Sequence, residues 1–254
     1  MPIQPTALEF LLFFLLILVS EIAGTIGGFG SSVFFVSLGQ FFYSFQTILV
    51  LTGIMHVFSN TSKLFLFWKS IHWKLVWWIG LSSVILAIIG ALLTRTIEFT
   101  YAKVLLGFFL ITLSTVLFLK PQTRIAPTLF NSIYGGALAG FLAGFIGTGG
   151  AIRGVVLTAF SLEKNFFVGT SAAIDFGVDF SRMLIYLDNG FLESEFIWHI
   201  PSLIIGAFLG SYLGKKALDR ISQETFRKII LGLIMAIGIS LVAKEFYRVY
   251  FTMI

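Results

Sequence analysis

The chain has 254 residues, of which 57% are hydrophobic and 11% are charged, and its formal net charge is +5 at pH 7. A soluble domain carries about 25% charged residues, so this composition excludes a soluble globular protein and indicates an integral membrane protein. Cysteine is absent, which excludes disulfides, thiol catalysis and zinc–thiolate sites.

The predicted elements of the first half are apolar runs of helical length, roughly 20 residues each. The first run covers residues 7–26, is interrupted by glycines at residues 24–30, and is followed by a short apolar piece at residues 31–38. Long runs follow at residues 45–68, 75–93 and 101–119. The segment 120–127, with two prolines and two cations, is loop-like and separates the halves.

The second half repeats this plan. A run at residues 129–146 is interrupted by glycines at 144–150, a short piece covers 151–160, and long runs follow at 166–187, 196–213 and 226–243. When the halves are aligned, four residues of the breaks coincide: Gly24, Ile26, Gly27 and Gly30 with Gly144, Ile146, Gly147 and Gly150. We therefore predict a duplicated protein, with residues 1–122 as the first transmembrane repeat and 123–254 as the second.

The distribution of lysine and arginine predicts how the broken runs cross the membrane, because cytoplasmic loops are richer in these residues. Complete crossing by both broken runs gives the two sides of the membrane equal numbers of lysines and arginines, whereas a return of each broken run to its own side of entry makes one side richer in them. The second arrangement also inverts the halves. We therefore predict an all-α polytopic protein of the cell (inner) membrane. Each of its two inverted repeats is a glycine-broken re-entrant helical hairpin plus three transmembrane helices, and both termini lie outside.

The glycine breaks are the first candidate site. Unpaired backbone cannot face lipid, so each break must be buried in protein or line a wet cavity. The helices that begin after the breaks, near Ser31 and Ala151, present free N–H groups and a positive dipole end, which favour an anion. Paired breaks of this kind indicate a transporter site at the middle of the bilayer. The expected substrate-binding residues are Gly27, Gly28, Gly30, Ser31, Gly147, Thr148, Gly149 and Gly150. The alternative is that these glycines only let helices pack closely.

Arg153 follows the second break within one helical turn. A charged residue deep in a membrane is costly and is a candidate for function, and the planar guanidinium matches an oxyanion. We expect Arg153 to contact the substrate. The alternatives are that it extends to the membrane interface or pairs with Asp175 or Asp179.

Two polar stripes occur within the apolar runs. Residues at helical spacing share one face, and this applies to Ser171, Asp175, Asp179, Arg182 and Tyr186 in the second half and to Thr52, His56, Asn60 and Lys63 in the first. We expect the stripes to face each other inside the bundle. An Asp179–Arg182 ion pair is the structural explanation, while proton coupling is the functional one. The candidates for it are Asp175, His56, Asp179 and Glu21.

The two breaks, the segment Val168–Ser171 and the duplication resemble the sulfite exporter TauE/SafE family of membrane transporters. The resemblance covers nearly the whole chain, and its most specific part is residues 144–154 followed by Gly169, Thr170 and Ser171. It implies a carrier of small anions such as sulfite, sulfonates or related organic acids. Ser171, which also lies on the polar stripe, is a further expected substrate-binding residue. The first half departs from the family pattern at Leu51, Thr52 and Gly53.

These observations predict a secondary transporter of a small anion, most simply a sulfur-containing oxyanion or organosulfonate, driven by protons. The alternatives are an anion channel on the same scaffold, a carrier of a small carboxylate, and, from another class, a membrane-embedded enzyme or assembly factor. No phosphate-binding loop, nucleophile elbow or ordered metal-ligand motif is present in the sequence. We therefore expect no enzyme activity, no metal, no cofactor and no nucleic-acid partner. The expected partners are the anion and the lipid bilayer, and a homodimer is one option for the oligomeric state.

Overall fold

The computed structural model describes residues 7–39, 43–93, 100–120, 125–146 and 149–252, and within them every regular element is a helix. The first half contains α1 (Ala7–Gly27), α2 (Ser31–Gly39), α3 (Phe45–Leu66), α4 (Trp73–Leu93) and α5 (Thr100–Leu119). The second half contains α6 (Leu129–Ile146), α7 (Gly150–Ala159), α8 (Lys164–Asp188), the 3₁₀ helix η1 (Ser194–His199), α9 (Ile200–Leu218) and α10 (Gln223–Thr252). Each half therefore has the order long, short, long, long, long.

The predicted all-helical class is confirmed, and most predicted boundaries agree within three residues. The largest differences are at the last two helices. The run predicted to start at residue 196 begins as η1, and α9 starts only at Ile200, where Pro201 occupies the first turn. Proline is tolerated there because that N–H has no partner within the helix. Helix α10 continues beyond the predicted end at residue 243 to Thr252, because the polar residues after Ala243 continue the helix outside the apolar stretch.

Glycines bring two helix pairs into close contact. Gly136, Gly140 and Gly144 recur every fourth residue on α6, and a Cβ added to any of them would lie 2.0–2.4 Å from a backbone oxygen of α4, on Ile79, Ser83 and Ala87 respectively. The same spacing on α9 places Gly206, Gly210 and Gly214 against Ile17, Glu21 and Thr25 of α1. Small residues let membrane helices approach in this way. Because residue numbers rise together across each contact, α4 runs parallel to α6 and α1 runs parallel to α9.

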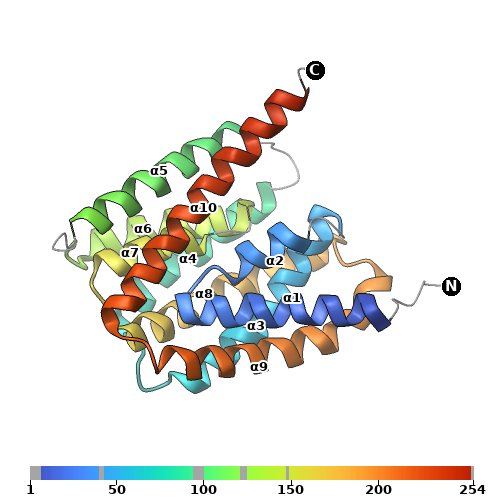
Figure 1. Cartoon of the computed structure of the whole chain (residues 1–254), viewed down its shortest axis with the longest axis horizontal. Coiled ribbons are helices and arrows are strands. Elements are labelled where there is room, and N and C mark those ends of the chain that lie inside the picture. Colours follow the sequence, from blue (N-terminus) through green and yellow to red (C-terminus); the bar gives the residue numbers. More distant parts are fainter. Residues whose placement is uncertain (1–6, 40–42, 94–99, 121–124, 147–148, 253–254) are drawn as a thin grey trace.

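Helices α3 and α8 form the centre of the molecule, and they run antiparallel. Gly53 faces Met183 while Asn60 is bonded to Asp179, so numbers rise along one helix as they fall along the other. Within the apolar stretch of α3, 67% of the residues are buried inside the protein. In the other four helices of the described residues that are long and apolar enough to cross a membrane, the buried share is 33–39%. Helices α5 and α10 are also antiparallel, with Gly107 near Val242 and Gly238 near Ile111, and they lie side by side at one edge (Figure 1).

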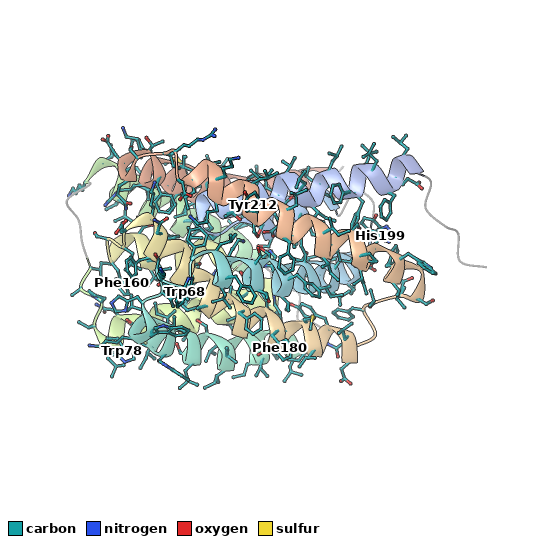
Figure 2. The ribbon with its side chains drawn as sticks, turned by 90° about the horizontal axis from the view of Figure 1, so that it is seen from below. Trp68, Trp78, Phe160, Phe180, His199 and Tyr212 are labelled. Atoms are coloured by element: carbon teal, nitrogen blue, oxygen red, sulfur yellow. The ribbon has the colours of Figure 1, made fainter. Side chains whose placement is uncertain are left out.

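The outer faces of the bundle are apolar. Exposed side chains include Trp68, Phe180 and Tyr212 (Figure 2). Five helices in the described residues are long and apolar enough to cross a membrane: Leu8–Gly27, Phe45–Leu66, Trp73–Leu93, Phe196–Leu218 and Gln223–Ala243. Helix α8, predicted as a full span, is not in this set although it has 25 residues, because it carries Asp175, Asp179 and Arg182. Its polarity reflects its place at the centre of the bundle.

Candidate functional site

The two glycine breaks meet inside the protein. Gly28 and Gly30 have positive φ values of 72° and 97°, a left-handed conformation that glycine adopts without strain. They turn the chain between α1 and α2, so that Phe29 packs against the second glycine break near Gly150. A Cβ on Gly150 would stand 3.3 Å from the Phe29 Cβ and 3.8 Å from the Gly30 nitrogen, and a Cβ on Gly154 would stand 2.5 Å from the Phe29 ring. The breaks are thus in direct contact.

The starts of both short helices line one cavity at this contact. Ser31 and Ser32 come from the first turn of α2, and Gly149 and Gly150 from the start of α7. The first N–H groups of a helix have no partner within it and carry its positive dipole end. The other lining residues are Gly28, Phe29, Gly30, His56, Asn60, Lys63, Ala143, Arg153, Ala172, Asp175, Asp179 and Arg182.

The cavity is nearly filled by its own side chains. The space in which the centre of a water molecule can stand is about 20 Å³. A water molecule needs about 10–15 Å³ of such space, so the cavity has room for about one. In this structure the site therefore has no room for a substrate larger than water.

Arg153 projects from α7 to α8, and only 2% of its side chain is exposed. Its Nε donates to the Ser171 hydroxyl at 3.0 Å, and its Nη2 donates to the Asp175 carboxylate. Of the alternatives for Arg153, extension to a membrane interface is excluded by this burial, and pairing with Asp175 is observed. Burying a guanidinium is tolerable only when its donors are satisfied, so Ser171 and Asp175 hold Arg153 at the cavity wall.

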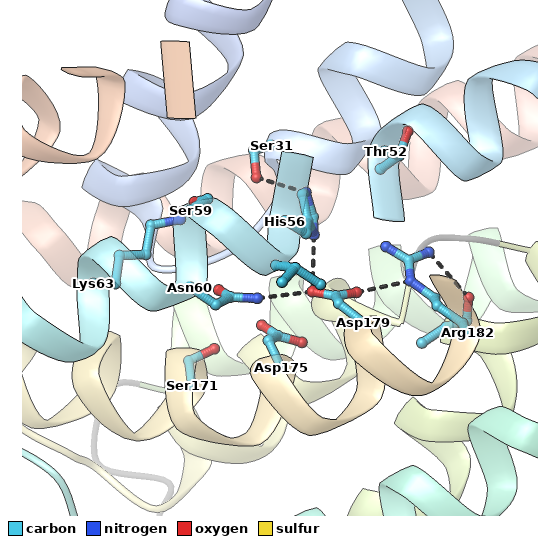
Figure 3. Close-up of polar contacts among 12 residues, drawn as sticks. Ser31, Thr52, His56, Ser59, Asn60, Lys63, Ser171, Asp175, Asp179 and Arg182 are labelled. Atoms are coloured by element: carbon cyan, nitrogen blue, oxygen red, sulfur yellow. Dashed lines mark hydrogen bonds and ion pairs between the residues drawn. The ribbon is translucent and has the colours of Figure 1, made fainter. Parts of the chain in front are cut away.

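Asp179 is the centre of a second network, drawn in Figure 3. One carboxylate oxygen accepts from His56 Nδ1 at 3.1 Å and from Asn60 Nδ2 at 2.8 Å, and the other accepts from Arg182 Nε at 2.7 Å. The predicted Asp179–Arg182 pair is therefore present. Because an ionised carboxylate only accepts, Nδ1 of His56 carries the hydrogen in this bond. Nε2 of the same ring is hydrogen-bonded to the Ser31 hydroxyl at 3.0 Å. This chain of bonds connects α8, α3 and the start of α2.

Lys63 connects the cavity to a third acid. Its Nζ is 3.2 Å from Glu21 Oε2, and the same carboxylate oxygen accepts from the Ser59 hydroxyl, which lies 3.3 Å from Ser211 Oγ. The Glu21 side chain is completely buried. Glu21 therefore lies behind Lys63, as seen from the cavity, between α1, α3 and α9.

The structure brings most of the predicted site residues together. Those that line the cavity are Gly28, Gly30, Ser31, His56, Gly149, Gly150, Arg153, Asp175 and Asp179. Three others do not line it: Gly27 packs against Leu233, Ser171 holds Arg153 from behind, and Glu21 holds Lys63. Gly147 and Thr148 lie outside the described residues.

Sequence reasoning did not select Asn60, Lys63 and Arg182 as site residues, although it placed them on the polar stripes. The signal that could have found them was the alignment of the halves, in which His56, Asn60 and Lys63 correspond to Asp175, Asp179 and Arg182. No sequence pattern indicates that Phe29 and Ser32 line the cavity, because their positions depend on the path of the chain through the first glycine break.

The fold and the site together define a polytopic membrane protein with a charged cavity enclosed between broken helices. The sequence profile of the sulfite exporter TauE/SafE family matches residues 12–241. The chain therefore belongs to this family, and it is a multi-pass membrane transporter rather than an enzyme. No curated protein and no solved structure matches the chain.

Proposed function

We propose that this protein is a secondary transporter that moves a small sulfur oxyanion or organosulfonate across the cell membrane together with protons. The observation that carries the proposal is the position of Arg153. A buried guanidinium stands where the two glycine breaks meet, at a cavity lined by two helix starts. Guanidinium groups and helix N-termini both bind oxyanions, and a charge buried within a membrane protein commonly marks the substrate path.

The proposal includes two inverted repeats, with a boundary at residues 122 and 123. Helix directions support it: α3 and α8 hold corresponding positions in the halves and run antiparallel, and so do α5 and α10. The pairing pattern supports it as well, because α4 packs on α6 as α9 packs on α1. Inverted repeats place the substrate at their interface, and two opposed arrangements of the repeats allow access from each side in turn.

The test is uptake into liposomes that contain the purified protein. Labelled sulfite, thiosulfate, sulfoacetate and acetate are offered with and without a pH gradient, and empty liposomes serve as the control. We expect accumulation of at least one sulfur anion above its external concentration when the gradient is present. Transport of all four anions only down their own gradients would indicate an anion channel instead. No protein-dependent flux of any of them would contradict the proposal.

A carrier of a small carboxylate is the second candidate, because the group bonded to Arg153 in this structure is itself a carboxylate, that of Asp175. The same experiment separates the two. Acetate taken up in preference to sulfite and sulfoacetate would favour the carboxylate carrier.

A further inference from the structure

The charges at the cavity are balanced without any substrate. Among the described residues that line it or pair with its lining, Lys63 is paired with Glu21, Arg153 with Asp175, and Arg182 with Asp179. Each of these three cations thus has one carboxylate, and the three pairs together have no net charge. An anion that entered this site alone would add one uncompensated negative charge to a buried place, which is costly.

The site also lacks room for an anion in this state. The free space accommodates about one water molecule, whereas a sulfur oxyanion or sulfonate has at least three heavy atoms around its sulfur. One of the groups that fill the cavity must therefore withdraw before a substrate can reach Arg153.

Asp175 is the carboxylate best able to withdraw. Its side chain is 16% exposed, against 3% for Asp179 and 0% for Glu21. Asp179 is held from three sides by His56, Asn60 and Arg182, and Glu21 lies behind Lys63. Asp175 lies at the cavity beside Asp179 on the same helix (Figure 3) and is bonded to Arg153, the residue proposed to bind the anion.

We propose that the Asp175 carboxylate occupies the anion subsite on Arg153, and that a single proton must neutralise Asp175 before one monovalent oxyanion can replace it. This inference rests on the function proposed above and specifies its substrate charge and stoichiometry. The proton binds a carboxylate oxygen of Asp175, the Arg153–Asp175 ion pair breaks, and an ion pair between Arg153 and the anion forms. The proton adds one positive charge and the anion one negative charge, so the loaded site is again neutral.

The surroundings of Asp175 agree with this exchange. The charged or titratable groups that face it are Arg153 from α7, His56 and Lys63 from α3, and Asp179 with Arg182 on its own helix. Helix α6 has no charged residue, and the one charge on α4, Lys74, stacks on Trp78. A bound anion is a further negative charge near Asp175 and favours a proton on it. The anion and the proton therefore strengthen each other's binding, and this coupling is reciprocal.

The first test is sulfite binding to detergent-purified wild type and Asp175→Asn at pH 8 and pH 6. Sulfite changes its own protonation over this range, so the two proteins are compared at the same pH. Asparagine is a permanent neutral form, and we expect Asp175→Asn to bind sulfite at least about tenfold more tightly at pH 8, which is about 1.4 kcal/mol. The advantage should shrink at pH 6. Asp219→Asn, the same change on an exposed ion pair, should bind like wild type.

Stability and transport provide independent readouts of the same variant. Without sulfite, Asp175→Asn leaves Arg153 without its charged partner, so it should melt at a lower temperature than wild type, and sulfite should raise its melting temperature more. In liposomes it should exchange sulfite at equal concentrations but lose accumulation driven by a pH gradient. If wild type binds sulfite and Asp175→Asn binds it no more tightly at pH 8, the subsite assignment is wrong. If wild type binds and transports none of the four anions, the proposed function fails as well.

The second test needs only the wild-type protein, so it holds even if the variant does not fold. Sulfite uptake into liposomes is driven by a fixed pH gradient in the presence of valinomycin. Potassium is either equal on both sides, which gives no membrane potential, or higher outside, which makes the inside positive. One monovalent anion with one proton carries no net charge, so the initial rate should be the same in both conditions. Faster uptake with the inside-positive potential would show that net negative charge moves, and it would overturn the one-to-one stoichiometry.

Discussion

Arg153 uses two nitrogens on two different partners, Nε on Ser171 and Nη2 on Asp175. The planar shape of the guanidinium therefore matters for this site as well as its charge. We expect Arg153→Ala to weaken sulfite binding by about 30-fold or more, since loss of a buried charged partner costs about 2–5 kcal/mol. Arg153→Lys should restore only part of the affinity, because an ammonium cannot reproduce the planar fork. Binding measured on folded, monodisperse protein is the check, and wild-type affinity in Arg153→Ala would remove Arg153 from the site.

Asp179 has a different role from Asp175, although both are carboxylates on one face of α8. It receives three hydrogen bonds from His56, Asn60 and Arg182. An asparagine there places an NH₂ group against one of these donors and removes the ionised carboxylate that accepts from Arg182. We expect Asp179→Asn to lower the free energy of unfolding by about 3–5 kcal/mol, as when one member of a buried pair is removed.

The control for this prediction is again Asp219→Asn. The Lys215–Asp219 pair spans one helical turn and the Asp219 side chain is 50% exposed, so its loss should cost about 0–1 kcal/mol. Unfolding in detergent, followed by tryptophan fluorescence, measures both variants. Equal stability of Asp179→Asn and Asp219→Asn would show that the Asp179 network is not structural.

At the scale of elements, the glycines of α6 and α9 determine how closely the halves approach. A Cβ on Gly140 would lie 2.0 Å from the Ser83 oxygen of α4, a contact that only a shift of one helix can relieve. We expect Gly140→Ala to destabilise the protein by about 1–3 kcal/mol, as overpacking does in other cores. Gly232→Ala is the matched control, since nothing lies within 4 Å of that added Cβ on α10. It should be neutral or stabilising, by up to about 1 kcal/mol, in the same unfolding experiment.

At the scale of the whole molecule, the re-entrant arrangement of the broken helices predicts which loops face the cytoplasm. The cations are concentrated on one side of the membrane only if each broken run returns to the side from which it entered, the first run from outside and the second from the cytoplasm. Because the chain has no cysteine, single cysteines can be introduced and labelled with a membrane-impermeant maleimide. Gln122→Cys should react only from the cytoplasmic side, and Thr96→Cys only from outside. Labelling of Gln122→Cys only from outside would contradict the re-entrant arrangement, because the side predicted to be rich in cations would then not be the cytoplasmic one.

The sequence alone determined the helical class, nearly all helix boundaries and the location of the breaks, because these depend on local properties. Apolar runs of membrane-spanning length predict helices wherever they occur, and consecutive glycines interrupt a run regardless of what surrounds them. The polar stripes were equally visible, since residues three and four apart share a helical face. For the same reason the Asp179–Arg182 pair, within one turn of α8, was predictable from spacing.

The tertiary structure alone decided the partners of the remaining charges. Glu21, one of the candidates for proton coupling, is paired with Lys63 of α3, and Gly27 packs on α10 and does not line the cavity. His56 is bonded to Ser31 and Asp179, which are far apart in the chain. Whether Arg153 meets Asp175 or Asp179, one helical turn apart on α8, depends on how far α7 extends along α8. That register is set by close packing between helices, and no local pattern in the sequence encodes it.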